Sequence, residues 1–136
     1  MYDKIRTILA ADSNVTDECP SSKFFDEEVA PNTTVPFIRI SAIEGEVNNT
    51  KNGASGLDEE RYAVQCFGKH LTTTNSEIGA RSLADLVRTS LDAHTATVGG
   101  TVLRIYCDDT GSGWSEKAKD GPIKAYEYEF VIEANR

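Results

Sequence analysis

The sequence has no long apolar run, no cluster of basic residues and few cysteines. No stretch approaches the roughly 20 apolar residues that a membrane-spanning helix needs, and nothing near the start resembles a signal peptide. We therefore expect no membrane contact, and synthesis in the cytoplasm. The net charge of −8, with Lys and Arg scattered, is unlike the basic patch of a nucleic-acid-binding protein.

The three cysteines, Cys19, Cys66 and Cys107, are odd in number and widely spaced, and no Cys-x-x-Cys occurs. This pattern indicates neither a disulfide framework nor a zinc site. Cys66 and Cys107 lie in strand-like runs, where a thiol is most often a small buried apolar group.

Motifs for catalysis are also missing. There is no phosphate-binding loop, dinucleotide fingerprint or nucleophile elbow. His70 and His94 have no ligand residues at suitable spacing, and we predict that both are exposed in loops. The pairs Glu59–Glu60 and Asp108–Asp109 are strand neighbours that point to opposite faces, so neither forms an acid–base dyad, although a metal at Asp108–Asp109 is a weak alternative. We predict no catalytic, cofactor-binding or metal-binding residue, and no enzyme.

What is present indicates one α+β domain over residues 1–136. Helical spacing of apolar residues predicts helices over 2–11 and from a capping box at 74–77 to about residue 93. A short strand is predicted at 24–25, and alternation predicts four main strands at the following ranges: 36–44, 58–68, 101–108 and 122–133. We predict a mostly antiparallel sheet of about four main strands with both helices on one face.

The longer helix and the last strand carry the clearest patterns. The helix has an apolar stripe from Ala80 to Leu91 and an opposite face of alternating charge. In the strand, Tyr126, Tyr128 and Phe130 share a face with Ile132, and glutamates occupy the other. This alternation indicates a sheet with one covered side.

Polar segments at 13–23, 45–56 and 109–121 are predicted to be loops. Trp114 either folds back over the edge of the core or anchors an interface, a role in which Trp is enriched. Two long loops, 45–56 and 109–121, are our candidates for contacting other proteins. The candidate residues on them are Asn48, Asn49, Lys51, Asn52, Trp114, Lys117 and Lys119.

The order of several segments resembles the bacteriophage tail-completion (tail-terminator) family. The start of the chain, Ile5–Asp12, is similar to the start of that family, whereas Lys23–Asp26 departs from its usual pattern. The other segments that carry the resemblance are Pro36–Ser41, Arg61–Phe67, Ala84–Asp92, Val98–Val102 and Tyr126–Phe130.

The resemblance implies a structural virion protein at the head–tail interface. It implies a homo-hexameric ring that caps the tail tube, ends tube polymerisation and meets the head-connector protein. Its partners would be the tail-tube protein and that connector or neck protein, with DNA passing through the lumen without specific binding. The acidic residues Asp17–Glu18 and Asp26–Glu28 are then either a solvated surface or one that repels DNA.

Two other functions stay open at this point. A head-closure or adaptor protein on the connector side would also form a ring, and the sequence separates it poorly from a terminator. A small-molecule-binding α+β domain would need a pocket with converging polar groups, and the sequence shows no such constellation.

Overall fold

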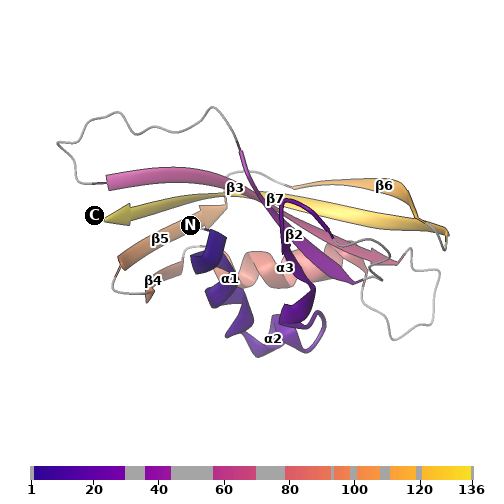
Figure 1. Ribbon diagram of the computed structural model, residues 1–136, viewed down its shortest axis with the longest axis horizontal. Coiled ribbons are helices and arrows are strands. Elements are labelled where there is room, and N and C mark those ends of the chain that lie inside the picture. Colours follow the sequence, from indigo (N-terminus) through magenta and orange to yellow (C-terminus); the bar gives the residue numbers. More distant parts are fainter. Residues whose placement is uncertain are drawn as a thin grey trace.

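A computed structural model of the chain describes residues 2–29, 36–43, 57–69, 79–92, 94–98, 101–107, 111–118 and 121–135. A long, twisted sheet forms one layer, and the helices lie together on one of its faces (Figure 1). The helical elements are α1 (Tyr2–Ala10), α2 (Ser13–Thr16), the 3₁₀ turn η1 (Ser21–Lys23) and α3 (Ala80–Leu91). This confirms the predicted α+β class.

The strands are β1 (Phe24–Asp26), β2 (Phe37–Ala42), β3 (Leu57–Lys69), β4 (His94–Val98), β5 (Thr101–Cys107), β6 (Ser112–Ala118) and β7 (Gly121–Asn135). They form a seven-stranded sheet in the order β1-β2-β3-β7-β5-β4, with β6 also paired to β7. All pairs are antiparallel except β1–β2. The four predicted main strands are confirmed, and they are joined by strands that the pattern missed.

The long pair β3–β7 holds the sheet together. Its register runs from Leu57 opposite Asn135 to Lys69 opposite Ile123. Both ends of β7 gain a further neighbour on the same edge: β6 pairs with its first half and β5 with its second. The sheet is therefore a ribbon with a different set of strands at each end.

The main core lies between the helices and one face of the sheet, which we call the helix-covered face. Alternate residues of β3 and β7 point into it, as the sequence predicted. Every residue of the predicted apolar stripe on α3 is buried there. The fully buried side chains with the largest volumes on this face are Phe130, Ile5, Leu9, Ile38, Ile40, Leu83, Leu91, Ile105, Ile132 and Val15.

The prediction of a loop over 13–23 is wrong in part, because α2 and η1 lie within it. The Asp12 carboxylate accepts a hydrogen bond from the Asn14 backbone N–H (2.9 Å) and caps α2. Val15 and Cys19 are both fully buried, so two apolar anchors fix an otherwise polar segment against the core. The short strand at 24–25 is confirmed as β1.

Helix α3 begins later than predicted. Gly79 has extended backbone angles (φ −80°, ψ 161°), and the first helical residue is Ala80. The predicted capping box at 74–77 lies outside the described residues. At the other end the Asp92 carboxylate accepts a hydrogen bond from the Cys107 N–H (2.8 Å), so α3 is tied to β5 where it ends.

Two strands replace segments that were predicted to be loops. His94 was placed in a loop, but it begins β4, which pairs with β5 from His94 opposite Ile105 to Val98 opposite Thr101. The predicted 109–121 loop contains β6, which pairs with β7 from Ser112 to Ala118. Strand β6 is polar and follows no strict alternation, and β4 is only five residues long, so pairing with a neighbour is what reveals them. Within the described residues, no helix is long and apolar enough to cross a membrane.

Candidate assembly surfaces

The thiols offer little chemistry. Cys19 and Cys66 are buried, Cys107 is partly buried, and none of the three forms a disulfide. Burial raises the pKa of the Cys19 thiol to about 12 and raises that of Cys66 well above its ordinary value. Since the thiolate is the reactive form, these two groups are inert at neutral pH and act as core side chains.

The structure describes only part of the residues that were weighed as weak metal or acid–base candidates. In the described part of the chain, no group of three or more His, Cys, Asp or Glu could hold a metal ion. Asp108, Asp109 and His70 lie outside the described residues. Glu60 on β3 accepts a hydrogen bond from the Tyr62 hydroxyl (2.9 Å).

The sheet face opposite the helices, which we call the second face, carries a cluster of four aromatic residues. Phe37 and Phe67 stack on neighbouring strands, with ring centroids 4.4 Å apart and planes 16° apart. Phe25 on β1 meets Phe37 edge-on at 6.1 Å, and Trp114 on β6 meets Phe67 edge-on at 6.2 Å. This aromatic cluster joins β1, β2, β3 and β6 across the sheet.

A polar row lies beside the aromatic cluster. Arg39, Gln65 and Glu127 are directly opposite one another on β2, β3 and β7. Arg39 Nε donates to Gln65 Oε1 (2.6 Å), and Gln65 Nε2 donates to Glu127 Oε1 (2.7 Å). The Arg39 guanidinium also lies 5.4 Å from the Phe67 ring centroid. The second face therefore holds a fixed polar arrangement in a partly exposed position.

On the helix-covered side, α3 contacts two tyrosines of β7. The Tyr128 hydroxyl donates to Asp85 Oδ1 (2.8 Å), and the Arg88 guanidinium lies 5.2 Å from the Tyr128 ring centroid. Arg81 lies 5.5 Å from the Tyr126 ring centroid. Burial, with the hydrogen bond to Asp85, raises the pKa of Tyr128 above its ordinary value. The charged face of α3 was predicted to be solvated. In the structure, Arg81, Asp85 and Arg88 on this face contact the tyrosines of the sheet.

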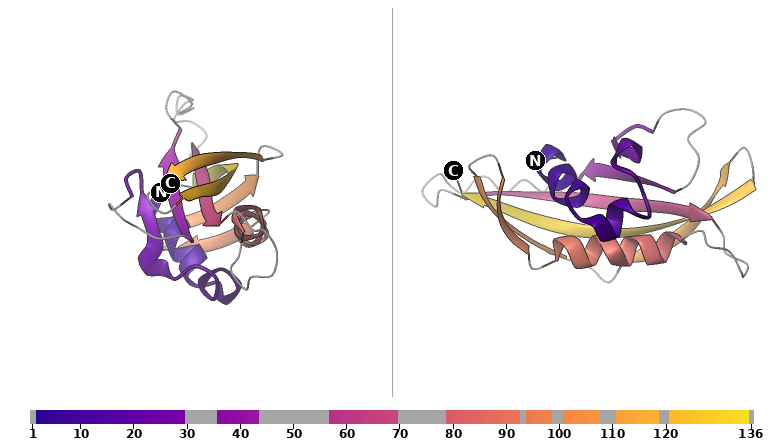
Figure 2. Two further views of the ribbon diagram at one scale, coloured as in Figure 1. Left: turned by 90° about the vertical axis from the view of Figure 1, so that its right-hand side faces the viewer. Right: turned by 90° about the horizontal axis from the view of Figure 1, so that it is seen from below.

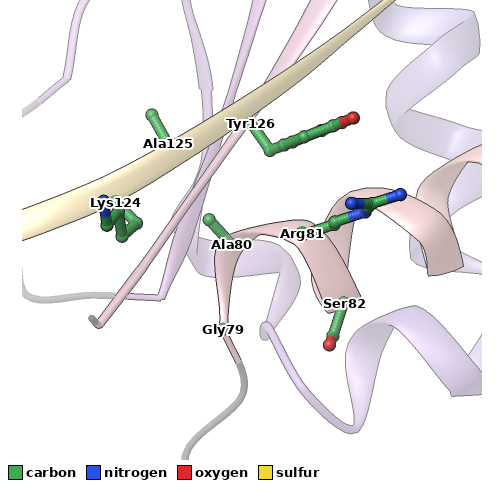
Figure 3. A pocket seen from close by; sticks show the side chains of 7 residues that line it. All are labelled: Gly79, Ala80, Arg81, Ser82, Lys124, Ala125 and Tyr126. Carbon is green, nitrogen blue, oxygen red and sulfur yellow. The ribbon is translucent and has the colours of Figure 1, made fainter. Parts of the chain in front are cut away.

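A pocket of about 230 Å³ lies where α3 begins. It is lined by Gly79, Ala80, Arg81, Ser82, Lys124, Ala125 and Tyr126. Figure 3 shows Tyr126 and Arg81 toward one end of it and Lys124 toward the other. Two cationic side chains flank the pocket, but it lacks the converging, buried polar groups of a small-molecule site.

The structure describes two of the seven predicted interaction residues. Trp114 and Lys117 lie on β6, opposite Ala125 and Pro122 of β7. Trp114 was predicted either to fold back over the edge of the core or to anchor an interface. Its ring packs on Phe67, and the residue is only partly buried, so this position is compatible with both roles. The others lie outside the described residues: Asn48, Asn49, Lys51, Asn52 and Lys119.

The sequence reasoning missed the aromatic cluster as a unit. The sequence contains one signal for this cluster. Residues 61–67 carry apolar side chains on both faces of the strand, so both faces must be covered by other side chains. A second signal was Phe37 directly after Pro36, on the face opposite Ile38. Only the register places Phe37, Phe67 and Trp114 in one row.

Comparisons with known proteins agree with this structural picture. The family model described as "Tail completion protein gp17" matches residues 3–119, which is most of the chain. No match was found among curated proteins. Among solved structures, a chain of the "Virion of native gene transfer agent (GTA) particle" is similar, with a TM-score of 0.63 and 10% sequence identity, over 97% of this chain and 92% of that chain. At this low identity, the structural likeness shows a shared fold.

The family match confirms the resemblance on which the predicted function rests. It runs from α1 through β6 and so includes α3 and most strands of the sheet. Members of this family are structural proteins of tail assembly, which accounts for the absence of catalytic motifs from the sequence. The chain belongs to the tail completion protein gp17 family, and it is a structural, non-enzymatic component of the virion tail.

Proposed function

We propose that this protein forms a closed ring on the end of the tail tube, ends polymerisation of the tube protein and forms the tail side of the head–tail joint. Membership of the tail-completion family is the observation that carries this proposal. The hexameric form of the ring comes from the family resemblance. The partners would be further copies of this chain, the tail-tube protein and the head-connector protein.

The two unlike faces of the sheet support a ring. The helix-covered face is closed by α1 and α3. The second face carries the row from Arg39 to Glu127 in partly exposed positions, beside an aromatic cluster in which Phe37 and Phe67 are buried. Subunits that join through two different surfaces form a heterologous contact, and such contacts close into rings when their rotation permits.

The charge supports passage of DNA through the ring. A net charge of −8 repels a polyanion, so DNA would slide without the salt-dependent binding that a basic lumen would produce. The acidic residues at the end of β1 and just after it, Asp26–Glu28, are exposed. An exposed acidic surface of this kind would fit the lumen or the ring face that DNA approaches.

Contacts with the tube or the connector would come from two segments. One is the β6–β7 hairpin, with Trp114 and Lys117 on β6 and Lys119 in the connection that follows. The other is the 45–56 segment with Asn48, Asn49, Lys51 and Asn52. The 45–56 segment is rich in small and polar residues, which are typical of contacts that order on assembly, whereas β6 and β7 of the hairpin are already paired.

Electron microscopy of particles made without this protein tests the proposal. We expect tails longer than normal, or tails without heads, and complementation with the wild-type gene should restore normal virions. Normal virions without the protein would overturn the proposal. Tails of normal length beside filled heads that lose their DNA would instead indicate the head-closure or adaptor function on the connector side.

Deletion of each contact segment tests its role separately. A chain lacking residues 46–55 should fold but fail to restore tail length or head joining. Replacement of Lys117 and Lys119 by Ala tests the hairpin in the same complementation assay, with Lys4→Ala on α1 as a matched control for lost charge. If a segment variant restores wild-type tails, that segment has no part in the contacts.

A further inference from the structure

The pocket at the start of α3 lies where the helix layer ends, on the side of the β6–β7 hairpin (Figure 2). Ala80, Ala125 and Tyr126 give it largely apolar walls. Arg81 and Lys124 flank it (Figure 3). Its volume of about 230 Å³ is below the roughly 300–1,000 Å³ of small-molecule sites, so it suits a single side chain of another protein.

The two cations at this pocket have no carboxylate partner within the described residues. Arg81 and Lys124 are both exposed, and neither takes part in an ion pair there. Arg81 instead lies 5.5 Å from the ring centroid of Tyr126. The chain has 22 acidic and 14 basic residues, so carboxylates are in excess. Two cations that share a pocket without one indicate that the carboxylate comes from another molecule.

Matching acids lie at the far edge of the sheet, in the turn that follows β1. Asp26 and Glu28, which we call the acidic pair, are both exposed. The Glu28 N–H donates to the Asp26 carbonyl oxygen (2.6 Å) across Glu27, whose φ is 65°, so a tight three-residue turn holds the pair. The carboxylates of the acidic pair form no hydrogen bond or ion pair with other described residues.

The register of the strands keeps the acidic pair away from the pocket of its own chain. Asp26 lies opposite Ile40, and Ile40 lies opposite Val64. Val64 lies opposite Tyr128, four residues from Lys124. At about 4.8 Å per strand and about 3.3 Å per residue, the two sites are about 20 Å apart. This exceeds the combined reach of a Lys and an Asp side chain, so the two sites can meet only between two copies of the chain.

We propose that the pocket of one subunit receives the acidic pair of the next subunit, with the Glu28 carboxylate between Arg81 and Lys124. The methylene groups of Glu28 would pack on Ala80 and Ala125, and the charged end would stay near solvent. This inference rests on the proposed function, because the contact joins neighbouring subunits of the ring. The pocket and the acidic pair are different surfaces of one chain, and a contact of this heterologous kind is what a closed ring requires.

The net charge of the chain gives this contact a purpose. Subunits with a charge of −8 repel one another. Opposite charges at one place in the interface offset the repulsion there and fix the orientation of the neighbour. In this position the acidic pair faces a neighbouring subunit and not the lumen, so the acidic wall toward DNA would consist of other exposed carboxylates.

A disulfide between copies tests the contact directly. The full chain with both Lys124→Cys and Glu28→Cys is supplied by complementation, and purified virions are oxidised mildly and run on a gel without reductant. We expect a ladder of linked subunits from the double variant and none from either single variant, since Cys19 and Cys66 are buried. Intact virions of the double variant without linked subunits would overturn the inference.

Charge reversal tests the same contact without new cysteines. Arg81→Glu/Lys124→Glu should lower the yield of joined virions about tenfold, because like charges then face each other. Addition of Asp26→Lys/Glu28→Lys in the same chain returns the net charge to −8 and should restore the yield to within about threefold of wild type. Circular dichroism checks that each variant folds. If the first variant does not fold, Lys124→Glu with and without Glu28→Lys decides in the same terms.

A matched control separates the contact from net charge. Asp17→Lys/Glu18→Lys also reverses two exposed acids, so with the reversed pocket it gives the same net charge, but it should not restore the yield. Equal rescue by this control would overturn the inference, as would an unchanged yield with the reversed pocket. Loss without rescue by the reversed acidic pair would also overturn it, because the pocket would then receive a different protein. The proposed function is tested separately by particles made without the protein, and normal virions there would refute the function itself.

Discussion

The two faces of the sheet are built on different principles. The helix-covered face is apolar and sealed, with Phe130 and Ile132 fully buried beneath α3 and its neighbours. The second face mixes stacked aromatic rings with the hydrogen-bonded row from Arg39 to Glu127. The first face depends mainly on volume and apolarity, with directional contacts only where α3 meets Tyr126 and Tyr128, whereas directional contacts between particular side chains run across the second face.

From this difference we expect the first face to carry most of the stability and the second face to serve the proposed assembly. A core tolerates exchange among apolar residues of similar volume. A polar and aromatic face changes its shape when one partner is lost, so it suits recognition of another protein. The following variants test this contrast, from the largest expected effect to the smallest.

Phe130→Ala should produce the largest loss of stability. Phe130 is completely buried on the helix-covered face, and replacement of a buried Phe by Ala costs about 3–5 kcal/mol through lost burial and a cavity. This is a large part of the roughly 5–15 kcal/mol of a typical domain. Urea unfolding followed by circular dichroism measures the loss. A loss below about 1 kcal/mol would show that this face packs no more tightly than the other.

Phe67→Leu should cost less, about 1–2 kcal/mol, because an apolar side chain of similar size remains while the aromatic contacts to Phe37 and Trp114 are lost. The same substitution should change Trp114 emission, since the edge-on ring contact disappears. Phe130→Leu provides the matched control on the opposite face. An unchanged Trp114 spectrum in Phe67→Leu would contradict the role of the aromatic cluster in holding β6.

Tyr128→Phe should cost about 1 kcal/mol, because it removes the hydrogen bond to Asp85 while keeping the ring in place. Burial raises the pKa of Tyr128 from about 10, so its contribution is present below pH 10 and is lost as the pH rises through the higher folded pKa. Ionisation of the buried thiols of Cys19 and Cys66 also lowers the stability at high pH, and it does so equally in wild type and variant. Wild type should therefore lose more stability than the variant above about pH 10, and parallel curves would contradict this.

Arg104→Ala should have the smallest effect. The Arg104–Glu133 pair has an N–O distance of 3.9 Å, and the Arg104 side chain is 72% exposed. Exposed pairs of this kind contribute less than about 1 kcal/mol and are weakened by salt. Thermal unfolding at low and high salt measures the change. A clear loss at high salt would mean that Arg104 does more than pair with Glu133.

The elements that could be predicted from the sequence are those in which apolar residues recur at a regular helical or strand spacing. The apolar stripe of α3, the alternation in β7 and the strand at β2 each contain enough repeats to identify the element and its buried face. The family resemblance, which rested on the order of these same segments, was confirmed by the family match.

The weakly patterned elements could not be predicted. Strand β6 has the composition of a Gly- and Ser-rich loop. It forms a strand where Gly113 fits against Tyr126 on the paired strand β7 and Trp114 packs on Phe67, which is far away in sequence. The end of α3 was placed too late, since Asp92 leaves the helix and binds the backbone of Cys107. The site depends on register, which brings Arg39, Gln65 and Glu127 into one row, and local patterns do not encode that register.

The short strand β1 is followed by a residue, Glu27, that covers part of the edge of β2. Just after β1, Glu27 adopts a positive φ of 65°, its backbone N–H donates to the Ile40 carbonyl (3.1 Å), and its carboxylate accepts from the Ala42 N–H (2.9 Å). An incoming strand would have to displace this carboxylate to pair with β2. Glu27 therefore occupies this end of β2, and we expect it to hinder edge-to-edge pairing with another chain before the protein joins the tail.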